Sequence, residues 1–459
     1  MNQHRVIKAS DVPTSPDALR DWIRENGICE VECIIPDQAG AAKGKVMPAL
    51  KFAEFNPLYL PVTIFLQSIT GSYADVDGEW ADTENDLHLK PDMSTVRPVP
   101  WSTDPSLQVI HDIYWQDGQP AEPAPRNVLK RVLERYADRG WQPVVAPEME
   151  FYLTNPNTNP DHPVEPPVGR SGRQGIGRQA YSISAVDEFE GVIDDIYEFA
   201  DAQGVDIDTI IHEAGASQLE FNFEHGDPLQ LADQVFVFKR VIREAAQRHG
   251  IYATFMSKPM EDEPGSAMHI HQSVVARKNG KNIFSDADGE PTTAFYEFIA
   301  GQQRFLGPAT CLMAPYVNSY RRLVPGASAP INLAWSFDNR SAGLRVPISG
   351  PAARRVENRV IGADANPYLA IAASLASGYL GMKEGLKPSD PIMTSAYEQQ
   401  PDLPRDLREA LESFEECAPL QNVLGEEFCK LYLTVKRHEF QEFMRVVSPW
   451  EREHLMLNV

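Results

Sequence analysis

Three short segments of the chain carry polar side chains two residues apart, and this spacing constrains the fold more than any other feature. In a β-strand, residues i and i+2 point to the same face. Each pair would therefore present two polar groups side by side, above apolar neighbours, as strands that line a pocket do. The pairs are Glu148 and Glu150 in PEMEF, His269 and His271 in AMHIHQS, and Glu357 and Arg359 in RRVENR.

The residue types in these segments indicate metal and phosphate chemistry. Carboxylates with imidazole suit hard or borderline divalent metal ions, and arginines suit phosphate. The segment HEAGASQLEFN adds Glu213 and Glu220. Taken singly, each pair could be solvent-exposed residues of an edge strand, but the set as a whole predicts metal-assisted phosphoryl chemistry. Arginines follow within one segment at Arg322, Arg340, Arg345, Arg354, Arg355 and Arg359.

Other nucleotide and nucleophile motifs are missing from the sequence. The stretch Gly40 to Val46 is one residue too short for a P-loop and ends in Val where Ser or Thr is required. No GxGxxG follows a predicted strand, and no GxSxG occurs. These absences argue against P-loop and Rossmann nucleotide sites and against a serine hydrolase.

Charge and cysteine usage limit the partners and the compartment. A net charge of −23 argues against nucleic-acid and anionic-membrane binding, because both need a basic face. The five scattered cysteines are typical of a reducing compartment, and Cys29 and Cys33 lack a second pair that would make a zinc site. The longest small-apolar stretch, Tyr368 to Met382, is too short to span a bilayer. We expect a cytoplasmic protein with no nucleic-acid or membrane partner.

The length of 459 residues favours two domains, with the boundary at the proline-rich PAEPAPR, so that residues 1–118 and 119–459 separate. Before it, the pattern predicts a helix over Pro16 to Glu25 and strands in VECIIP, VTIFLQ and SLQVIHDIYW. After it, strands and helices alternate. The predicted elements are strands in WQPVVAPEMEFYL, QLEFNFEH (half-buried and antiparallel), IYATFMSKP and AMHIHQSVVARKNGKNIF (with a hairpin at Asn279-Gly280), helices in Asn127 to Ala137, EFEGVIDDIYEFADAQG and Leu229 to His249, a surface loop at 155–169, and mostly helix from Asn366.

Six motifs in order resemble the glutamine synthetase family over roughly residues 120 to 459, and KGKVMP resembles its N-terminal domain. They are PEMEF, HEAGASQLE, GSAMHIHQS, NSYRRLVPG, NRSAGLRVP and RRVENRVIGADANPYL. The resemblance implies an N-terminal β-grasp domain (1–118) and a catalytic domain (119–459) with a curved antiparallel sheet and surrounding helices. It also implies a homo-oligomer, a dodecamer of two hexameric rings, with active sites between neighbouring subunits.

The resemblance also implies roles for individual residues. Glu150, Glu213 and Glu220 resemble the ligands of one divalent metal, and Glu148, His269 and Glu357 those of a second, either Mg²⁺ or Mn²⁺. The ATP-contacting positions match His271, Ser273, Arg340, Arg345 and Arg355. The glutamate-binding positions match Gly265, Arg322 and Arg359, and the catalytic arginines match Arg322, Arg340 and Arg359.

Two departures from ammonia-using members concern the ammonium site. The flap turn Gly326-Ala327-Ser328 has Ser328 where those enzymes carry a glutamate. The N-terminal loop FLQSITGSY offers Gln67, Ser68, Thr70 and Ser72, with no acid before Asp75, where they carry an aspartate. Losing both anions removes the electrostatic trap for NH₄⁺. It leaves room for a larger amine.

The sequence thus predicts an ATP-dependent ligase that joins the γ-carboxylate of L-glutamate to a primary amine through γ-glutamyl phosphate. SAYEQQPDLPRDLREAL and ADANPYL resemble the γ-glutamyl-polyamine branch and favour putrescine. Trp335 and Phe337 in AWSFDN, near the site arginines, would equally suit a small monoamine such as isopropylamine or ethanolamine. A glutamine synthetase that uses ammonia and a non-catalytic regulator of the same family remain alternatives.

Overall fold

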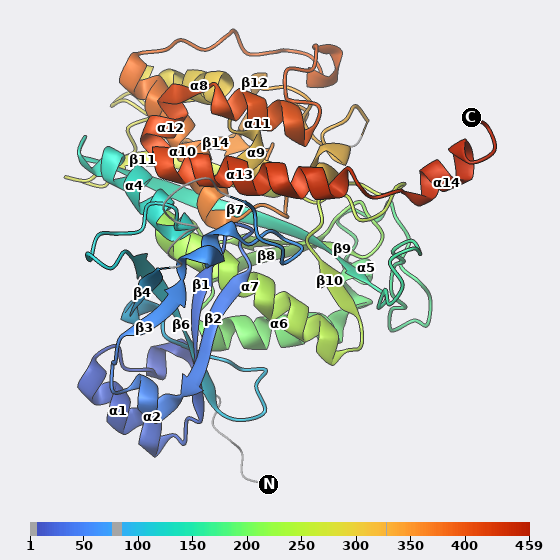
Figure 1. Cartoon of the computed structure of the whole chain (residues 1–459). Coiled ribbons are helices and arrows are strands. Elements are labelled where there is room, and N and C mark those ends of the chain that lie inside the picture. The colour runs from blue at the N-terminus through green and yellow to red at the C-terminus, as the bar shows by residue number, and fades with distance from the viewer. Residues whose placement is uncertain (1–6, 76–84, 327) are drawn as a thin grey trace.

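The computed structural model describes residues 7–75, 85–326 and 328–459. Two sheets, one in each half of the chain, organise these residues, and helices lie above and below the larger sheet (Figure 1). Ala327, part of the predicted flap turn, lies outside the described residues. The fold is α+β, as the family resemblance implied.

The N-terminal sheet has six strands in the order β2-β1-β6-β4-β3, with β5 paired to β6. The central pair, β1 and β6, is parallel, whereas β1 and β2 are antiparallel. Leu19 and Ile23 pack with Val31 and Val109 beneath this sheet. The strands are β1 (Glu30–Pro36), β2 (Ala42–Pro48), β3 (Leu58–Pro61), β4 (Asp86–Pro91), β5 (Arg97–Pro98) and β6 (Ser106–Tyr114).

One predicted strand in this half is wrong. VTIFLQ forms the 3-10 helix η2 (Val62–Leu66), which buries Val62, Phe65 and Leu66. These residues lie three and four positions apart, so a tight helical turn brings them to one side. A short apolar run does not distinguish strand from helix by its period alone.

The larger sheet has eight strands in the order β12-β13-β14-β11-β7-β9-β8, with β10 paired to β7. Its pairs are antiparallel except for β12 with β13. The strands are β7 (Trp141–Thr154), β8 (Ile207–His212), β9 (Gln218–Phe223), β10 (Tyr252–Thr254), β11 (Met268–Ala276), β12 (Trp335–Phe337), β13 (Leu344–Val346) and β14 (Val356–Asn358).

The predicted alternation places the core on one face of this sheet. Met149, Phe221, Ile270 and Val356 are buried in one large hydrophobic cluster, and the intervening polar residues therefore point to the other face. The polar face of β9 was predicted to be exposed, but Gln218 and Glu220 are buried too. Alternation indicates which face is polar, and it does not indicate what covers that face.

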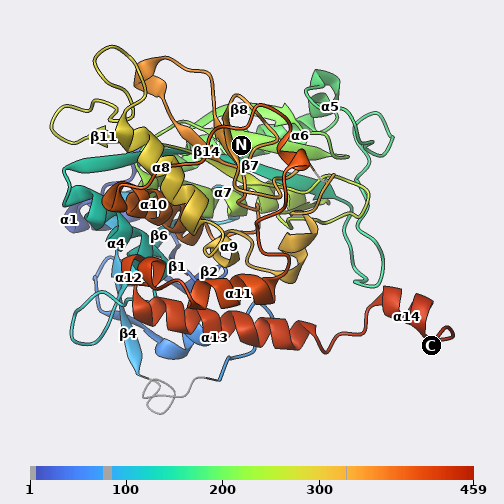
Figure 2. The ribbon, with the colours of Figure 1, turned by 90° about the horizontal axis from the view of Figure 1, so that it is seen from above.

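Helices pack against the sheets and confirm most of the predicted helical segments. Figure 2, seen from above, shows α8, α10, α11, α12 and α13 gathered on one side, with α14 projecting away from the body as it does in Figure 1. No helix in the described ranges is long and apolar enough to cross a membrane. The helices are α1 (Pro16–Glu25), α2 (Ala49–Phe52), α4 (Pro125–Ala137), α5 (Ile183–Asp187), α6 (Glu190–Gln203), α7 (Pro228–Arg248), α8 (Thr293–Phe305), α9 (Thr310–Met313), α10 (Pro367–Glu384), α11 (Leu407–Glu415), α12 (Ala418–Leu424), α13 (Glu426–Phe443) and α14 (Pro449–Leu455).

A buried arginine joins the two halves of the chain. Arg126, on α4, pairs with Asp92 (2.7 Å) and Asp112 (2.5 Å) beside the N-terminal sheet, and with Asp233 (2.9 Å) on α7. The hydrogen bonds that the guanidinium donates to these carboxylates, and their charges, offset its desolvation, and the pKa of Arg126 rises above its usual value. The first residues beyond the predicted boundary are therefore tied to both sheets.

Candidate active site

The polar face of the larger sheet brings the predicted pairs together across neighbouring strands. Glu148 on β7 lies opposite His269 on β11, and His271 lies opposite Glu357 on β14. Glu150 lies opposite Glu220 on β9. Residues directly opposite each other share a face of the sheet. Four strands that are far apart in the sequence thus build one row of acids and histidines.

Two groups in this row have the geometry of a metal site. Their potential ligand atoms lie within 4.8 Å of one another, and the groups are Glu148, His271 and Glu357, and Glu148, Glu220 and His269. Both groups combine carboxylate oxygens with imidazole nitrogens, which suits Mg²⁺ or Mn²⁺. They share Glu148 and divide the residues differently from the two sets that the resemblance implies.

The remaining two predicted ligands lie beside these groups. Glu150 accepts hydrogen bonds from the Ala267 backbone N–H (2.7 Å) and from Gln218 Nε2 (3.2 Å). Glu213 follows the end of β8, and its charge acts on Glu150 and Glu220. Gln218 has no role in the sequence prediction. It could have been found from its place on the polar face, two residues before Glu220.

The acids have pKa values that a divalent cation would change. Burial and the charge of Glu213 raise the pKa of Glu150 to about 8, and burial and the charge of Glu150 raise that of Glu220. Burial also disfavours the charged form of Glu148, but hydrogen bonds from His269 (3.2 Å) and His271 (2.7 Å) outweigh it and hold its pKa well below the usual range. A cation among these groups would favour their ionised forms.

The surroundings of the two histidines affect the pKa of His269 and the position of the ring proton of His271. Burial, together with the charge of Arg359, lowers the pKa of His269 to about 4. Arg355 Nε lies 3.1 Å from His271 Nδ1 and can only donate, so that Nδ1 accepts. The proton of His271 is therefore on Nε2, directed at Glu148.

Arginines line the Glu357 side of the row. Arg345 donates to Glu357 (2.8 Å) and to Asp338 (3.0 Å), and Arg359 also donates to Glu357. The Nε atoms of Arg345 and Arg359 are buried and have no hydrogen-bond partner in the described part of the chain. Unpaired buried donors of this kind suit an anionic group of a ligand.

Two other predicted contacts with ATP lie at the margins of the row. Ser273 is on β11, opposite Val144, and is partly buried. Arg340 is exposed, and its charge lowers the pKa of Glu213, although burial raises that pKa overall. The structure thus brings both residues toward the acids without fixing either of them by a hydrogen bond to the row.

The predicted glutamate-binding residues form a packed unit. A Cβ added to Gly265 would lie 2.6 Å from Arg322 Cγ and 2.6 Å from the carbonyl oxygen of Ser257. Arg322 is buried and donates to the carbonyl oxygens of Val360 (2.8 Å) and Arg359 (2.9 Å). Arg322 therefore fixes the backbone that carries Arg359.

The N-terminal loop around residue 70 is not as poor in acid as its own sequence indicated. Glu439 on α13 accepts from the Ile69 backbone N–H (2.8 Å). Glu442 accepts from Thr70 Oγ1 and Ser72 Oγ, both at 2.8 Å. These acids are about 370 positions away in the chain, so local sequence could not reveal them.

The aromatic residues of AWSFDN do not face the site arginines, contrary to the sequence argument for a monoamine pocket. Ser336 pairs with Arg345 across β12 and β13, whereas Trp335 pairs with Leu344 and Phe337 with Val346. Because neighbours in a strand alternate between faces, Trp335 and Phe337 point to the face opposite Arg345.

Comparisons with known proteins identify the family of the chain. The model of the glutamine synthetase catalytic domain matches residues 122–455. Gamma-glutamylputrescine synthetase PuuA of Escherichia coli (strain K12) is 34% identical over 437 residues, covering 93% of this chain and 92% of the relative. Glutamate–isopropylamine ligase of Pseudomonas sp is 32% identical over 450 residues, covering 94% and 96%.

A glutamine synthetase of Halobacterium salinarum is 32% identical over 454 residues, covering 96% of each chain. Among solved structures, a GmaS/ADP complex superposes with a TM-score of 0.81 at 27% identity, covering 95% of this chain and 99% of that chain. These similarities span the whole length on which the site is built. The chain belongs to the glutamine synthetase family, whose members are ATP-dependent ligases that join glutamate to ammonia or to an amine.

Proposed function

We propose that this ligase joins the γ-carboxylate of L-glutamate to a primary amine through γ-glutamyl phosphate, and that the amine is a diamine such as putrescine. One observation carries the proposal: the acid, histidine and arginine set is complete, whereas the two anions of an ammonium site are replaced by Ser328 and by the polar loop around Thr70. Activation by phosphorylation is required because a carboxylate is a poor acyl donor.

The proposed roles follow the family resemblance, and the row supplies the acids and histidines for them. Glu150, Glu213 and Glu220 would hold one divalent ion, and Glu148, His269 and Glu357 a second. Bound Mg²⁺ or Mn²⁺ would supply neutralisation of phosphate charge. In the chain itself, His271, Ser273, Arg340, Arg345 and Arg355 would hold ATP, and Arg322, Arg340 and Arg359 would surround the transferred phosphoryl group.

Gly265, Arg322 and Arg359 would bind glutamate. Arg322 and the carbonyl oxygen of Ser257 fill the space that a side chain at position 265 would need, so only glycine lets Arg322 pack here. The buried Nε of Arg359 has no hydrogen-bond partner among the described residues, which suits a carboxylate oxygen. Arg359 donates to Glu357, and the γ-carboxylate would meet the phosphate there.

The acids of α13 that contact the N-terminal loop support a diamine over a monoamine. In the family resemblance, this loop caps the amine site of a neighbouring subunit. Glu442, held against the loop by Thr70 and Ser72, would offer an anionic partner to the distal ammonium of a diamine. An apolar monoamine lacks a second charge to pair with it, and Trp335 and Phe337 lie on the other side of β12.

The deciding measurement compares kcat/KM for putrescine with kcat/KM for isopropylamine, ethanolamine and ammonia. The rate of ADP release is the readout. For a diamine enzyme, kcat/KM should fall by the equivalent of several kcal/mol when the amine lacks the distal ammonium. The reason is that the anionic partner of that ammonium is left unpaired. A higher kcat/KM for a monoamine would overturn the assignment of a diamine substrate, whereas the assignment as a ligase would stand. Ammonia as the best substrate would make the protein a glutamine synthetase, and no ADP with any amine would favour a regulator.

The C-terminal arm supports assembly into a ring oligomer, such as the dodecamer of two hexameric rings. α14 and the residues around it project from the body in both views (Figures 1 and 2). Trp450 is 62% exposed and Leu457 91%. Apolar surface of this extent is typical of a protein–protein contact. The five unpaired cysteines are consistent with a cytoplasmic location.

A further inference from the structure

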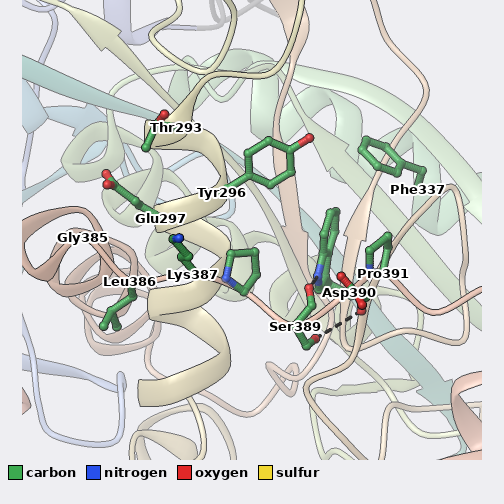
Figure 3. A pocket seen from close by; sticks show the side chains of 12 residues that line it. Thr293, Tyr296, Glu297, Phe337, Gly385, Leu386, Lys387, Ser389, Asp390 and Pro391 are labelled. Carbon is green, nitrogen blue, oxygen red and sulfur yellow. Dashed lines mark hydrogen bonds between the residues drawn. The ribbon is translucent and has the colours of Figure 1, made fainter.

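A cavity of about 430 Å³ lies behind β12, on the face of the strand opposite Arg345 (Figure 3). Its walls come from α8, from β12 and from the segment that follows α10. None of the predicted metal, ATP or glutamate residues lines it. The lining residues used below are Tyr296, Glu297, Trp335, Phe337, Lys387 and Asp390.

Three aromatic rings form one wall of this cavity. The ring centroids of Tyr296 and Trp335 are 6.1 Å apart, and those of Trp335 and Phe337 are 5.5 Å apart, both in edge arrangements. Trp335 Nε1 donates to the carbonyl oxygen of Ser389 (2.8 Å), which fixes the indole ring. Electron-rich faces held in this way suit a cation.

The charged groups at the cavity form no ion pairs with the residues that the structure describes. Burial raises the pKa of Glu297, and its carboxylate makes no hydrogen bond or ion pair within the described ranges. Lys387 and Asp390 likewise form no ion pair in the part of the chain that is described. Two carboxylates against one ammonium leave the cavity with an excess of negative charge, which favours a cationic ligand.

The cavity wall is continuous with the candidate active site. Asp338 follows Phe337 directly and has a φ of 46°, a left-handed conformation that is uncommon for a residue other than glycine. The same Asp338 accepts from Arg345 (3.0 Å), and Arg345 donates to Glu357 (2.8 Å). A ligand that shifts Phe337 would therefore act on Arg345 through the adjacent residue.

We propose that this cavity is a second binding site, distinct from the active site, for a small organic ammonium ion, and that its occupancy alters the binding of ATP. The ammonium group would pair with Glu297, and the carbon chain would lie along the rings of Tyr296 and Trp335. The inference does not rest on which amine the enzyme acylates, because binding to the cavity requires no turnover.

The test uses a cation that cannot become an amide. N,N,N′,N′-tetramethylputrescine has two tertiary amines and no N–H to lose on acylation. Its binding to the full chain would be measured by isothermal titration calorimetry without ATP or glutamate. Glu297→Gln should weaken binding about tenfold, because it removes a charge-assisted hydrogen bond. The matched control is Glu384→Gln, at the exposed end of α10, which should bind as the wild type does.

A second measurement tests the link to the active site. A saturating concentration of the probe should change KM for ATP in the wild type and not in Glu297→Gln, while both proteins keep the same Tm and the same activity without probe. Equal binding by the wild type and Glu297→Gln would place the probe elsewhere and overturn the proposal, as would no binding to the wild type. Probe binding with an unchanged KM for ATP would overturn the link to Arg345.

Discussion

Glu150 and Glu220 lie directly opposite each other on β7 and β9, and both side chains are buried. Like charges at such a position destabilise a strand pair. Burial, strengthened by neighbouring carboxylates, raises the pKa of each group. The protein therefore holds two acids in a place that favours folding only when a proton or a cation neutralises them.

The first prediction concerns stability against pH in the metal-free protein. The folded-state pKa of Glu150 is raised from 4.5 to about 8, so its contribution to the free energy of unfolding is present below pH 4.5 and is lost as the pH rises through 8. Calorimetry of the protein in the presence of a chelator should show that Tm falls between pH 4.5 and about pH 8. Glu150→Gln should flatten the fall, and saturating Mg²⁺ or Mn²⁺ should reverse it. Identical slopes in both proteins would contradict the prediction.

The second prediction concerns His269, which lies between Glu148 and Glu357. If His269 is the metal ligand that we propose, His269→Ala should lower kcat at least about 100-fold, because loss of a ligand costs at least as much as loss of its supporting hydrogen bonds. Tm should change little, since the substitution removes a polar group and not core volume. ADP release is the measurement, and the exposed His162→Ala is the control. A variant with more than a tenth of wild-type activity would show that His269 is not needed.

The third prediction uses two glycines. Gly265→Ala would place a Cβ 2.6 Å from Arg322 Cγ, so Arg322 must move and KM for glutamate should rise about tenfold or more. Gly350→Ala is the matched control, because no atom lies within 4 Å of its added Cβ and its φ of −70° is ordinary. Glutamate titrations of both variants would decide. An unchanged KM in Gly265→Ala would remove Arg322 from the glutamate site.

The fourth prediction concerns the C-terminal arm. Deletion of residues 448–459, which contain α14, should reduce the size of the assembly measured by light scattering, because it removes the exposed Trp450 and Leu457. Glu453→Gln, on the same helix, should leave the size unchanged. A truncated protein of wild-type size would show that the arm is not part of the subunit contacts.

The sequence was sufficient for the elements that repeat a period over many residues. α7 and the strand that contains Glu148 and Glu150 follow the predicted segments closely, because long periodic stretches carry a strong signal. The i, i+2 spacing likewise placed His269 and His271 correctly on one face of β11. VTIFLQ was too short to distinguish a strand from a 3-10 helix.

Contacts between segments that are distant in the chain could not be predicted from the sequence. The approach of Glu442 to Thr70 and Ser72 depends on how α13 packs against the N-terminal half. The turn of Trp335 and Phe337 away from Arg345 depends on the register of β12 with β13. Even Arg359 lies one residue beyond the end of β14, although it still reaches Glu357. Such arrangements follow from tertiary packing, which the local sequence pattern does not predict.

The ion pairs of Arg126 determine how the protein can be divided into fragments. A fragment that begins at residue 119 would keep Arg126 and Asp233 but lose Asp92 and Asp112. It would also uncover Leu431 and Val435 of α13, which pack into the core beneath the N-terminal strands. Breaking a buried ion pair costs about 3–5 kcal/mol, a large part of the stability of a typical domain. We therefore expect the two halves to melt as a single cooperative unit, and an exchange with a relative's half to need both halves together.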